Sequence, residues 1–201
     1  MKTNNDRSPT APPPSVALVL EFVNTHADAG GRIEQFDDAA GLRGWLDRVE
    51  LPDELRADRC DLEVTGADAA SARELRDALV TLLLAHSGEE GSLGEPLAEA
   101  ESYLQRVASR YPLTSVIGAE GVTLQAEQTG VPGVLASVLA GITELAQSGA
   151  WSRVKACRNP PCHFGFFDRT RNSSAGFCSP GCASQASMRA YRQRKKNAAA
   201  R

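Results

Sequence analysis

Four of the five cysteines in this 201-residue sequence lie close together near its C-terminal end. They form two pairs, Cys157 with Cys162 and Cys178 with Cys182, and fifteen residues separate the pairs. A tetrahedral zinc site needs four ligands about 2.3 Å from the ion, and paired cysteines on two short turns supply two ligands each. We therefore predict that these four thiolates hold one structural Zn²⁺ ion.

The residues around both pairs favour this geometry. Asn159-Pro160-Pro161 predicts a tight turn inside the first pair. Ser179 and Pro180 are typical of a helix N-cap and of the first helical position, so Cys182 is predicted in the opening turn of a C-terminal helix. Between the pairs, we expect a strand from His163, a loop, and a return of the chain at Phe177. Without metal, such a short and polar segment is expected to be mostly unfolded, because zinc binding supplies the free energy of folding.

Other assignments of the cysteines stay open. Two disulfides or four unrelated buried thiols are the alternatives, but clustered cysteines in a chain without a secretion signal favour metal binding. His163, beside Cys162, is an alternative ligand. Four protein ligands leave no coordination position for water, so we expect no metal-assisted hydrolysis.

Three further residues have reactive side chains but no catalytic pattern. Cys60 has no neighbouring histidine or acid that would form a triad, and we expect it to be a small buried side chain. His26, after Asn24-Thr25, either lines a ligand pocket or has a capping or surface role, which is the simpler expectation. His86 is expected to have a similar role at a helix end. We therefore do not expect an enzyme.

The segment after the second pair is predicted to be a basic helix. From Pro180 to Lys196 it is rich in alanine and free of helix-breaking residues. Positions 185, 189, 192 and 196 fall within about 60° on an α-helix and form a polar, cationic stripe. Met188 and Tyr191 are expected to pack back on the finger.

Double-stranded DNA is the partner that such a helix suits, since lysine and arginine contact phosphates and one or two side chains reach base edges. A solvated basic tail without a partner is the alternative. The candidate nucleic-acid-binding residues are Gln185, Arg189, Arg192, Arg194, Lys195, Lys196, Arg169 and Arg171.

Charge is distributed unevenly along the chain. Residues 151–201 carry eleven Lys or Arg and one acid, Asp168, and have a formal charge of +10, whereas residues 1–150 have a formal charge of −13. Such an asymmetry indicates a nucleic-acid-binding or membrane-surface segment attached to an acidic body.

The first 150 residues read as a helical body. The type of the segment at 18–23 is left open. Apolar periodicity predicts helices from Asp37 or Asp38 to a stop at Pro52, from about 68 to 86, from about 95 to 110, and, as the longest, from about 132 to 148. Two β-favouring runs between 113 and 128 predict a hairpin.

The predicted fold is therefore mainly α with a small β component (α+β). It consists of a helical N-terminal domain with a β-hairpin, followed by a small four-cysteine zinc finger that ends in a basic helix. We expect residues 1–15 to be a disordered leader, residues 16–150 to form the domain for sensing or dimerisation, and residues 151–201 to form the finger and helix.

Neither a secretory signal nor a membrane helix is predicted. The first fifteen residues lack an apolar core. The longest uncharged, largely apolar stretch, at 131–142, has twelve residues, short of the roughly 20 that a membrane helix needs. We expect a cytoplasmic protein without a membrane partner. A homodimer and an unknown small-molecule effector are left open as further partners.

Together these features resemble the CGNR zinc-finger family, bacterial proteins with a four-cysteine finger behind an N-terminal domain called ABATE that are described as stress-induced transcription regulators. The resemblance starts at about residue 16 and rests on Leu20-Glu-Phe-Val-Asn-Thr25, the Leu42–Leu46 segment, the Ala72–Ala78 helix and the finger. In the finger it is carried by the four cysteines, Phe167, Asp168, Asn172, Arg189, Tyr191, Arg192 and Arg194. It implies that the cysteines bind zinc, that the finger binds DNA and that residues 16–150 form an ABATE-like domain.

The sequence departs from the family pattern near the zinc site. The family's Arg-Arg-Trp before the third cysteine is Ala175-Gly176-Phe177 here, its Cys-Gly-Asn-Arg is Cys182-Ala-Ser-Gln185, and a usual lysine is Ser187. Either the base specificity has changed, with Gln185 pairing to adenine, or binding has become mostly electrostatic. The alternative function is a protein-interaction module whose structural zinc finger has lost specific DNA binding.

Overall fold

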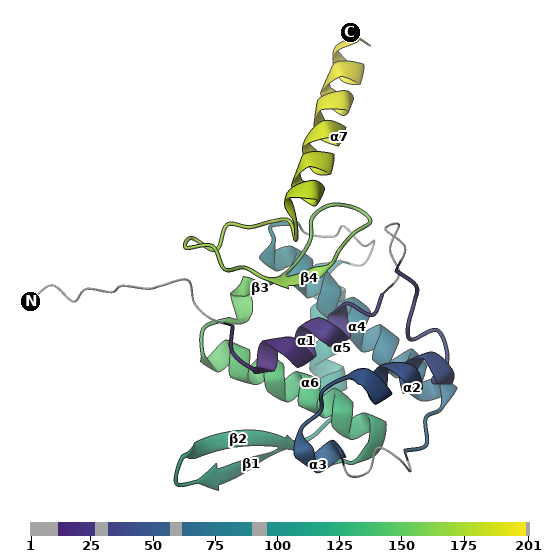
Figure 1. Ribbon diagram of the computed structural model, residues 1–201, viewed down its shortest axis with the longest axis vertical. Coiled ribbons are helices and arrows are strands. Elements are labelled where there is room, and N and C mark those ends of the chain that lie inside the picture. Colours follow the sequence, from purple (N-terminus) through teal and green to yellow (C-terminus); the bar gives the residue numbers. More distant parts are fainter. Residues whose placement is uncertain (1–11, 27–31, 57–61, 90–95, 200–201) are drawn as a thin grey trace, which may run out of the picture.

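The computed structural model describes residues 12–26, 32–56, 62–89 and 96–199 (Figure 1). Its helices are α1 Ser15–Val23, α2 Ala39–Arg48, α3 Asp53–Arg56, α4 Gly66–His86, α5 Leu97–Ala108, α6 Gly130–Gln147, the 3₁₀ helix η2 Trp151–Arg153, and α7 Pro180–Ala199. Its strands are β1 Leu113–Gly118, β2 Gly121–Ala126, β3 Val154–Ala156 and β4 Gly165–Phe167, and they form two antiparallel hairpins. The predicted mainly α fold with a small β component is confirmed.

Two helices of the body, α2 and α4, begin where side chains cap them. Asp38 caps α2 through its carboxylate, as predicted. Thr65 and Asp68 form a capping box that starts α4 two residues before the predicted position. The segment at 18–23, whose type was left open, belongs to α1. The prediction that the helix at 132–148 is the longest is wrong, because α6 has 18 residues and α4 has 21.

The core lies where α1 packs between α4 and α6 (Figure 1). Three residues of α1, Val19, Phe22 and Val23, are completely buried. The ring of Phe22 lies 5.6 Å from that of Phe36 and 5.7 Å from that of Trp45 between centroids, in tilted and edge-on arrangements that aromatic pairs favour. Helix α1 is thus the central element of the body, and its C-terminal end faces the finger.

Helix α6 is the most apolar long helix of the body. Residues 130–147 are long and apolar enough to cross a membrane, a longer segment than the twelve residues considered above, but half of this segment is buried inside the fold. Val134, Leu135 and Val138 belong to the hydrophobic core. The apolar character of α6 is therefore explained by core packing.

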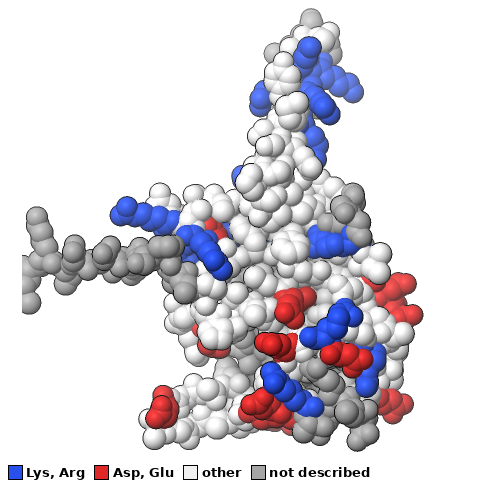
Figure 2. Space-filling model, in the orientation of Figure 1, with Lys and Arg blue, Asp and Glu red and all other residues white. Residues whose placement is uncertain are grey.

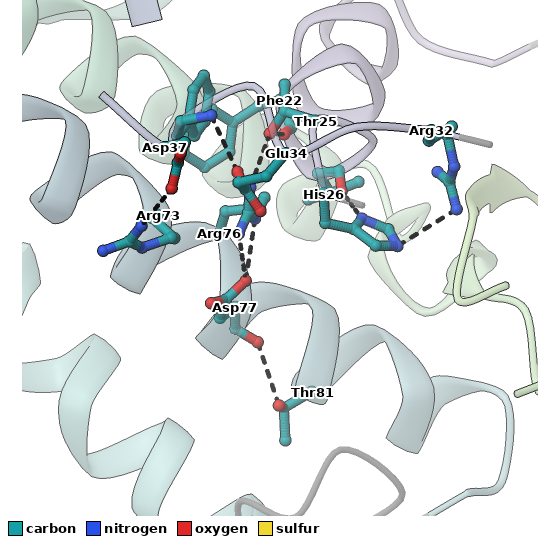
Figure 3. A network of polar contacts seen from close by, with 12 residues as sticks. Phe22, Thr25, His26, Arg32, Glu34, Asp37, Arg73, Arg76, Asp77 and Thr81 are labelled. Atoms are coloured by element: carbon teal, nitrogen blue, oxygen red, sulfur yellow. Dashed lines mark hydrogen bonds and ion pairs between the residues drawn. The ribbon is translucent and has the colours of Figure 1, made fainter. Parts of the chain in front are cut away.

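A buried arginine joins three segments of the body (Figure 3). Arg76 on α4 is 1% exposed, and its guanidinium donates to Oδ1 of Asp77 at 2.9 and 2.8 Å and to Glu34. It also lies 3.4 Å from the Thr25 hydroxyl, which in turn donates to the Phe22 carbonyl at 2.8 Å. These contacts tie α4 to the end of α1.

Replacing Arg76 with methionine is expected to lower the free energy of unfolding by about 2 kcal/mol, because the partly buried Glu34 carboxylate then loses its charge-assisted donor. Arg73→Met is the matched control on the same helix, since the Arg73 side chain is 40% exposed and its ion pair with Asp37 spans 3.8 Å. The control should change stability by no more than about 0.5 kcal/mol. Urea denaturation measures both values, and equal losses would contradict the role of Arg76.

Candidate metal centre

The four predicted cysteines converge at the base of α7. Their sulfur atoms all lie within 4.8 Å of one another, and the Cys162–Cys178 and Cys178–Cys182 distances are both 3.7 Å. Four ligands about 2.3 Å from a tetrahedral zinc ion lie about 3.8 Å from one another. The sulfurs therefore fit one structural zinc ion, and their separation excludes the disulfide alternative, since none of the four is bonded to another.

The first cysteine pair lies in the loop that connects β3 to β4. Cys157 follows β3 directly, and its N–H donates to the Phe164 carbonyl at 3.0 Å. The N–H of Cys162 donates to the Asn159 carbonyl at 2.6 Å, which closes the predicted tight turn. The predicted strand after Cys162 corresponds to β4. Strand β3 was missed, because three residues are too few to show a hydrophobic period.

The second pair is positioned by the start of α7. Helix α7 begins at Pro180, and the Ser179 hydroxyl oxygen accepts from the Cys182 N–H at 3.2 Å, as the predicted N-cap requires. The chain returns beside the first pair as expected, since the Arg158 N–H donates to the Gly176 carbonyl at 3.0 Å. This return is not a strand.

His163 is not a member of the metal-binding cluster. Among the described residues, the potential ligand atoms that lie close enough to share one metal ion are the four cysteine sulfurs. The His163 side chain is buried, and its Nδ1 atom has no hydrogen-bond partner in the described part of the chain. The arrangement therefore favours the four cysteines over the histidine alternative.

The thiols differ in how readily they lose a proton. Burial raises the pKa of Cys162 to about 11 and also raises that of Cys178. Burial opposes ionisation of Cys182 as well, but hydrogen bonds from Ser179 and Asn159 lower its pKa to about 7. Because zinc binds thiolates, the metal must displace protons from the more basic thiols, and its affinity falls as the pH falls.

A buried ion pair holds the loop that connects the two cysteine pairs. Lys155 on β3 and Asp168 after β4 are 5% and 0% exposed at their side chains, and Nζ lies 2.8 Å from Oδ2. Lys155 also donates to the carbonyls of Ser173 and Ala175, at 2.6 and 3.2 Å. Asp168 accepts from the N–H and hydroxyl of Thr170 and from the N–H of Ala175, at 2.6 to 2.8 Å. Both charges are thus hydrogen-bonded, which a buried pair requires. In the sequence, Asp168 stood out as the single acid of a basic segment and as a residue of the family resemblance, but nothing pointed to Lys155 as its partner.

Both histidines of the body, which are partly buried, contact the finger. The Nε2 atom of His26 lies 3.2 Å from the Cys162 carbonyl oxygen, and Nδ1 of His86 lies 2.8 Å from the Val154 carbonyl oxygen. Burial lowers the pKa of both imidazoles, so both are neutral near pH 7. Cys60 lies outside the described residues.

Two of the predicted DNA-binding residues are tied to the finger. The Asn159 side chain donates to Oε1 of Gln185 at 3.0 Å and accepts from the Arg189 guanidinium. These contacts join the second and third turns of α7 to the turn inside the first cysteine pair. Gln185 and Arg189 therefore help to fix the direction of α7.

The other predicted DNA-binding residues are exposed, and all lie on α7 or on the loop after β4. They are Arg192, Arg194, Lys195, Lys196, Arg169 and Arg171. The prediction that Met188 and Tyr191 pack on the finger is wrong, since these side chains are 52% and 56% exposed. The face of α7 that turns toward Asn159 carries Gln185 and Arg189, and Met188 and Tyr191 lie about 80° and 140° around the helix from it.

Two family models match the chain. The ABATE model, described as "Putative stress-induced transcription regulator", matches residues 17–149. The model of the CGNR zinc finger matches residues 153–195. No curated protein matches the chain.

The purified chain is expected to contain one zinc ion, which elemental analysis by mass spectrometry can count. Cys178→Ser should lower the zinc content to well below one equivalent, because one of the four thiolate ligands is lost. Cys60→Ser, which changes the fifth cysteine, is the matched control and should retain a full equivalent. A Cys178→Ser protein with undiminished zinc content would contradict the four-cysteine site.

Asp168→Asn is expected to lower the free energy of unfolding by about 3 kcal/mol at pH 7, since it leaves the Lys155 ammonium buried without its counter-charge. Burial acts to raise the pKa of Asp168, but hydrogen bonds from Lys155 and Thr170 lower it overall. The stabilisation is therefore complete above the unfolded pKa of about 3.9 and is lost as the pH falls below it.

Chemical denaturation of both proteins, after chelator treatment to exclude titration of zinc ligands, measures this difference from pH 7 to pH 3. Glu120→Gln, at an exposed residue in the turn between β1 and β2, is the control and should differ little from the wild type. A constant difference between Asp168→Asn and wild type across this range would contradict the assigned ionisation.

Proposed function

Because this chain belongs to the ABATE family and ends in a CGNR zinc finger, we propose that it is a transcription regulator that binds double-stranded DNA through its finger and α7. The observation that carries the proposal is the placement of α7. Helix α7 projects away from the acidic body and carries its cationic side chains with it (Figures 1 and 2). The four cysteines converge at its N-terminal end.

The shape and charge of α7 suit a DNA groove. Its 20 residues span about 30 Å, and the major groove of DNA admits an α-helix. No residue of α7 is buried, and Figure 2 shows Lys and Arg along it without an acidic side chain. Four cations, at positions 192, 194, 195 and 196, lie in its outer half. Within the described residues, none of them forms an ion pair, so all four can contact phosphates.

Binding is expected to depend more on phosphates than on bases. Gln185, which would pair to adenine if base specificity had changed, is hydrogen-bonded to Asn159, and so is Arg189. The exposed Arg169 and Arg171 on the loop after β4 add cations near the base of α7. Phosphate contacts bind without reading sequence, so we expect modest discrimination between DNA sequences.

In this role, the body senses a signal or joins two copies of the chain. A cavity of about 610 Å³ lies between α1, α3, the β1–β2 hairpin and α6, and its volume is in the range of small-molecule sites.

No catalysis is assigned to the metal, since four thiolates leave no coordination position open. A cytoplasmic location is part of this proposal.

A second candidate function is docking of another protein on α7. Met188 and Tyr191 are large and exposed, and methionine and tyrosine are enriched in protein interfaces. A pull-down that yields a stable protein complex, without any DNA shift at low salt, would favour this function.

DNA binding is tested by fluorescence anisotropy with random-sequence duplexes at several salt concentrations. With about four to six phosphate contacts, the logarithm of the affinity should fall with the logarithm of the salt concentration with a slope of about −4 to −5. Arg192→Ala should weaken binding to all sequences about equally and reduce the slope by about 1. Arg106→Ala, at an exposed position on α5, is the matched control and should bind like the wild type.

Full duplex affinity after deletion of residues 178–201 would overturn the proposal. A slope near zero in the intact chain would do the same, because binding through phosphates releases counterions.

A further inference from the structure

The finger's two-stranded sheet is completed on both edges by side chains of the body. Within the part of the chain that the structure describes, β3 and β4 pair only with each other, and an isolated pair of strands is marginally stable in water. In each strand, backbone groups face away from the partner strand. The C-terminal ends of α1 and α4 supply hydrogen bonds to these groups, where a third and a fourth strand would otherwise lie.

On the β4 edge, Asn24 at the end of α1 bonds both backbone groups of Gly165. The Gly165 N–H donates to Oδ1 at 2.7 Å, and Nδ2 donates to the Gly165 carbonyl at 3.0 Å. The approach is close, because a Cβ atom at position 165 would lie 2.6 Å from a methyl carbon of Val23. The backbone of Asn24 ends α1, and its side chain acts as a short segment of a neighbouring strand.

On the β3 edge, two residues at the end of α4 perform the same task. The Ser87 hydroxyl donates to the Ala156 carbonyl at 2.6 Å, and His86 contacts the Val154 carbonyl. The His86 ring also packs edge-on against Trp151, with 5.1 Å between centroids. Ala156 immediately precedes Cys157, so this edge fixes the first cysteine of the site.

A third contact reaches the second cysteine. The Nδ1 atom of His26 lies 2.8 Å from the Val23 carbonyl oxygen, and its Nε2 atom lies 3.2 Å from the Cys162 carbonyl oxygen. Nε2 also lies 3.3 Å from the Arg32 guanidinium (Figure 3). Arg32 also donates to the Cys162 carbonyl. The body thus contacts the residue beside Cys157 and the backbone of Cys162.

We propose that Asn24 is a positioning residue for the metal centre, because its two bonds to Gly165 hold the β3–β4 sheet, and with it Cys157 and Cys162, in place before the metal binds. The other pair, Cys178 and Cys182, belongs to the start of α7, which has no buried residues. The metal therefore joins a cysteine pair that the body fixes to a pair that α7 carries. This differs from the expectation that the whole finger unfolds without zinc.

The test uses the full chain and Co²⁺ as the metal probe, since thiolate–cobalt absorption reports the site independently of DNA. Asn24→Ala should weaken Co²⁺ binding about tenfold or more, the usual effect of losing a group that orients metal ligands. Val107→Ala is the control for general destabilisation, because Val107 is buried on α5, which packs on α4. The control should lower the melting temperature and leave the Co²⁺ affinity unchanged.

A Co²⁺ affinity of Asn24→Ala equal to that of the wild type would overturn the proposal. The proposal would also be overturned if Asn24→Ala weakened Co²⁺ binding no more than Val107→Ala does at the same loss of melting temperature. A failure of DNA binding would not affect this result, because the measurement contains no DNA.

Hydrogen exchange of the wild-type chain provides a second test that needs no variant. After zinc removal with a chelator, the amides of β3 and β4 should keep their protection while those in the first turns of α7 lose it. Loss of protection in both places would show that the body does not hold the sheet, and would overturn the proposal.

Discussion

The convergence of four sulfur atoms within 4.8 Å is the constraint on which the rest of this structure depends. It brings the end of β3, the start of β4 and the first turn of α7 to one point. Helix α7 buries no residue of its own, so packing alone does not fix its direction. Zinc–thiolate bonds, together with the Asn159 contacts to Gln185 and Arg189, supply what a hydrophobic interface would otherwise provide.

Buried charges organise both halves of the chain by the same rule. Arg76 in the body and the Lys155–Asp168 pair in the finger are buried, and each has several hydrogen-bond partners on different segments. A buried charge is tolerated only when such partners are in place, so each one specifies the arrangement of the segments around it. The Arg76 network holds the end of α1, and the end of α1 in turn holds β4.

The body and the finger have formal charges of opposite sign, which bears on where an anion would bind. The segment of charge +10 ends in a helix that leaves the body, whose own formal charge is −13. The acidic body disfavours contact with DNA phosphates on its own surface and leaves the projecting helix as the favourable place for an anion. The departures from the family pattern near the zinc site remove cations at the base of this helix, while those in its outer half remain.

The sequence by itself determined the features that depend on residues close together in the chain. These features are the spacing within each cysteine pair, the Ser179 cap of α7, the Asp38 cap of α2 and the periodicity of the amphipathic helices. Each depends on residues within one or two helical turns of one another, and the structure contains each of them. Only the tertiary structure decided the partners of Asn24, His26 and Ser87, which lie 141, 136 and 69 residues away in sequence. No local pattern specifies such partners, because a polar side chain that caps its own helix and one that completes a distant strand have the same composition and spacing. The exposure of Met188 and Tyr191 was likewise decided by the direction in which the metal centre and Asn159 point α7.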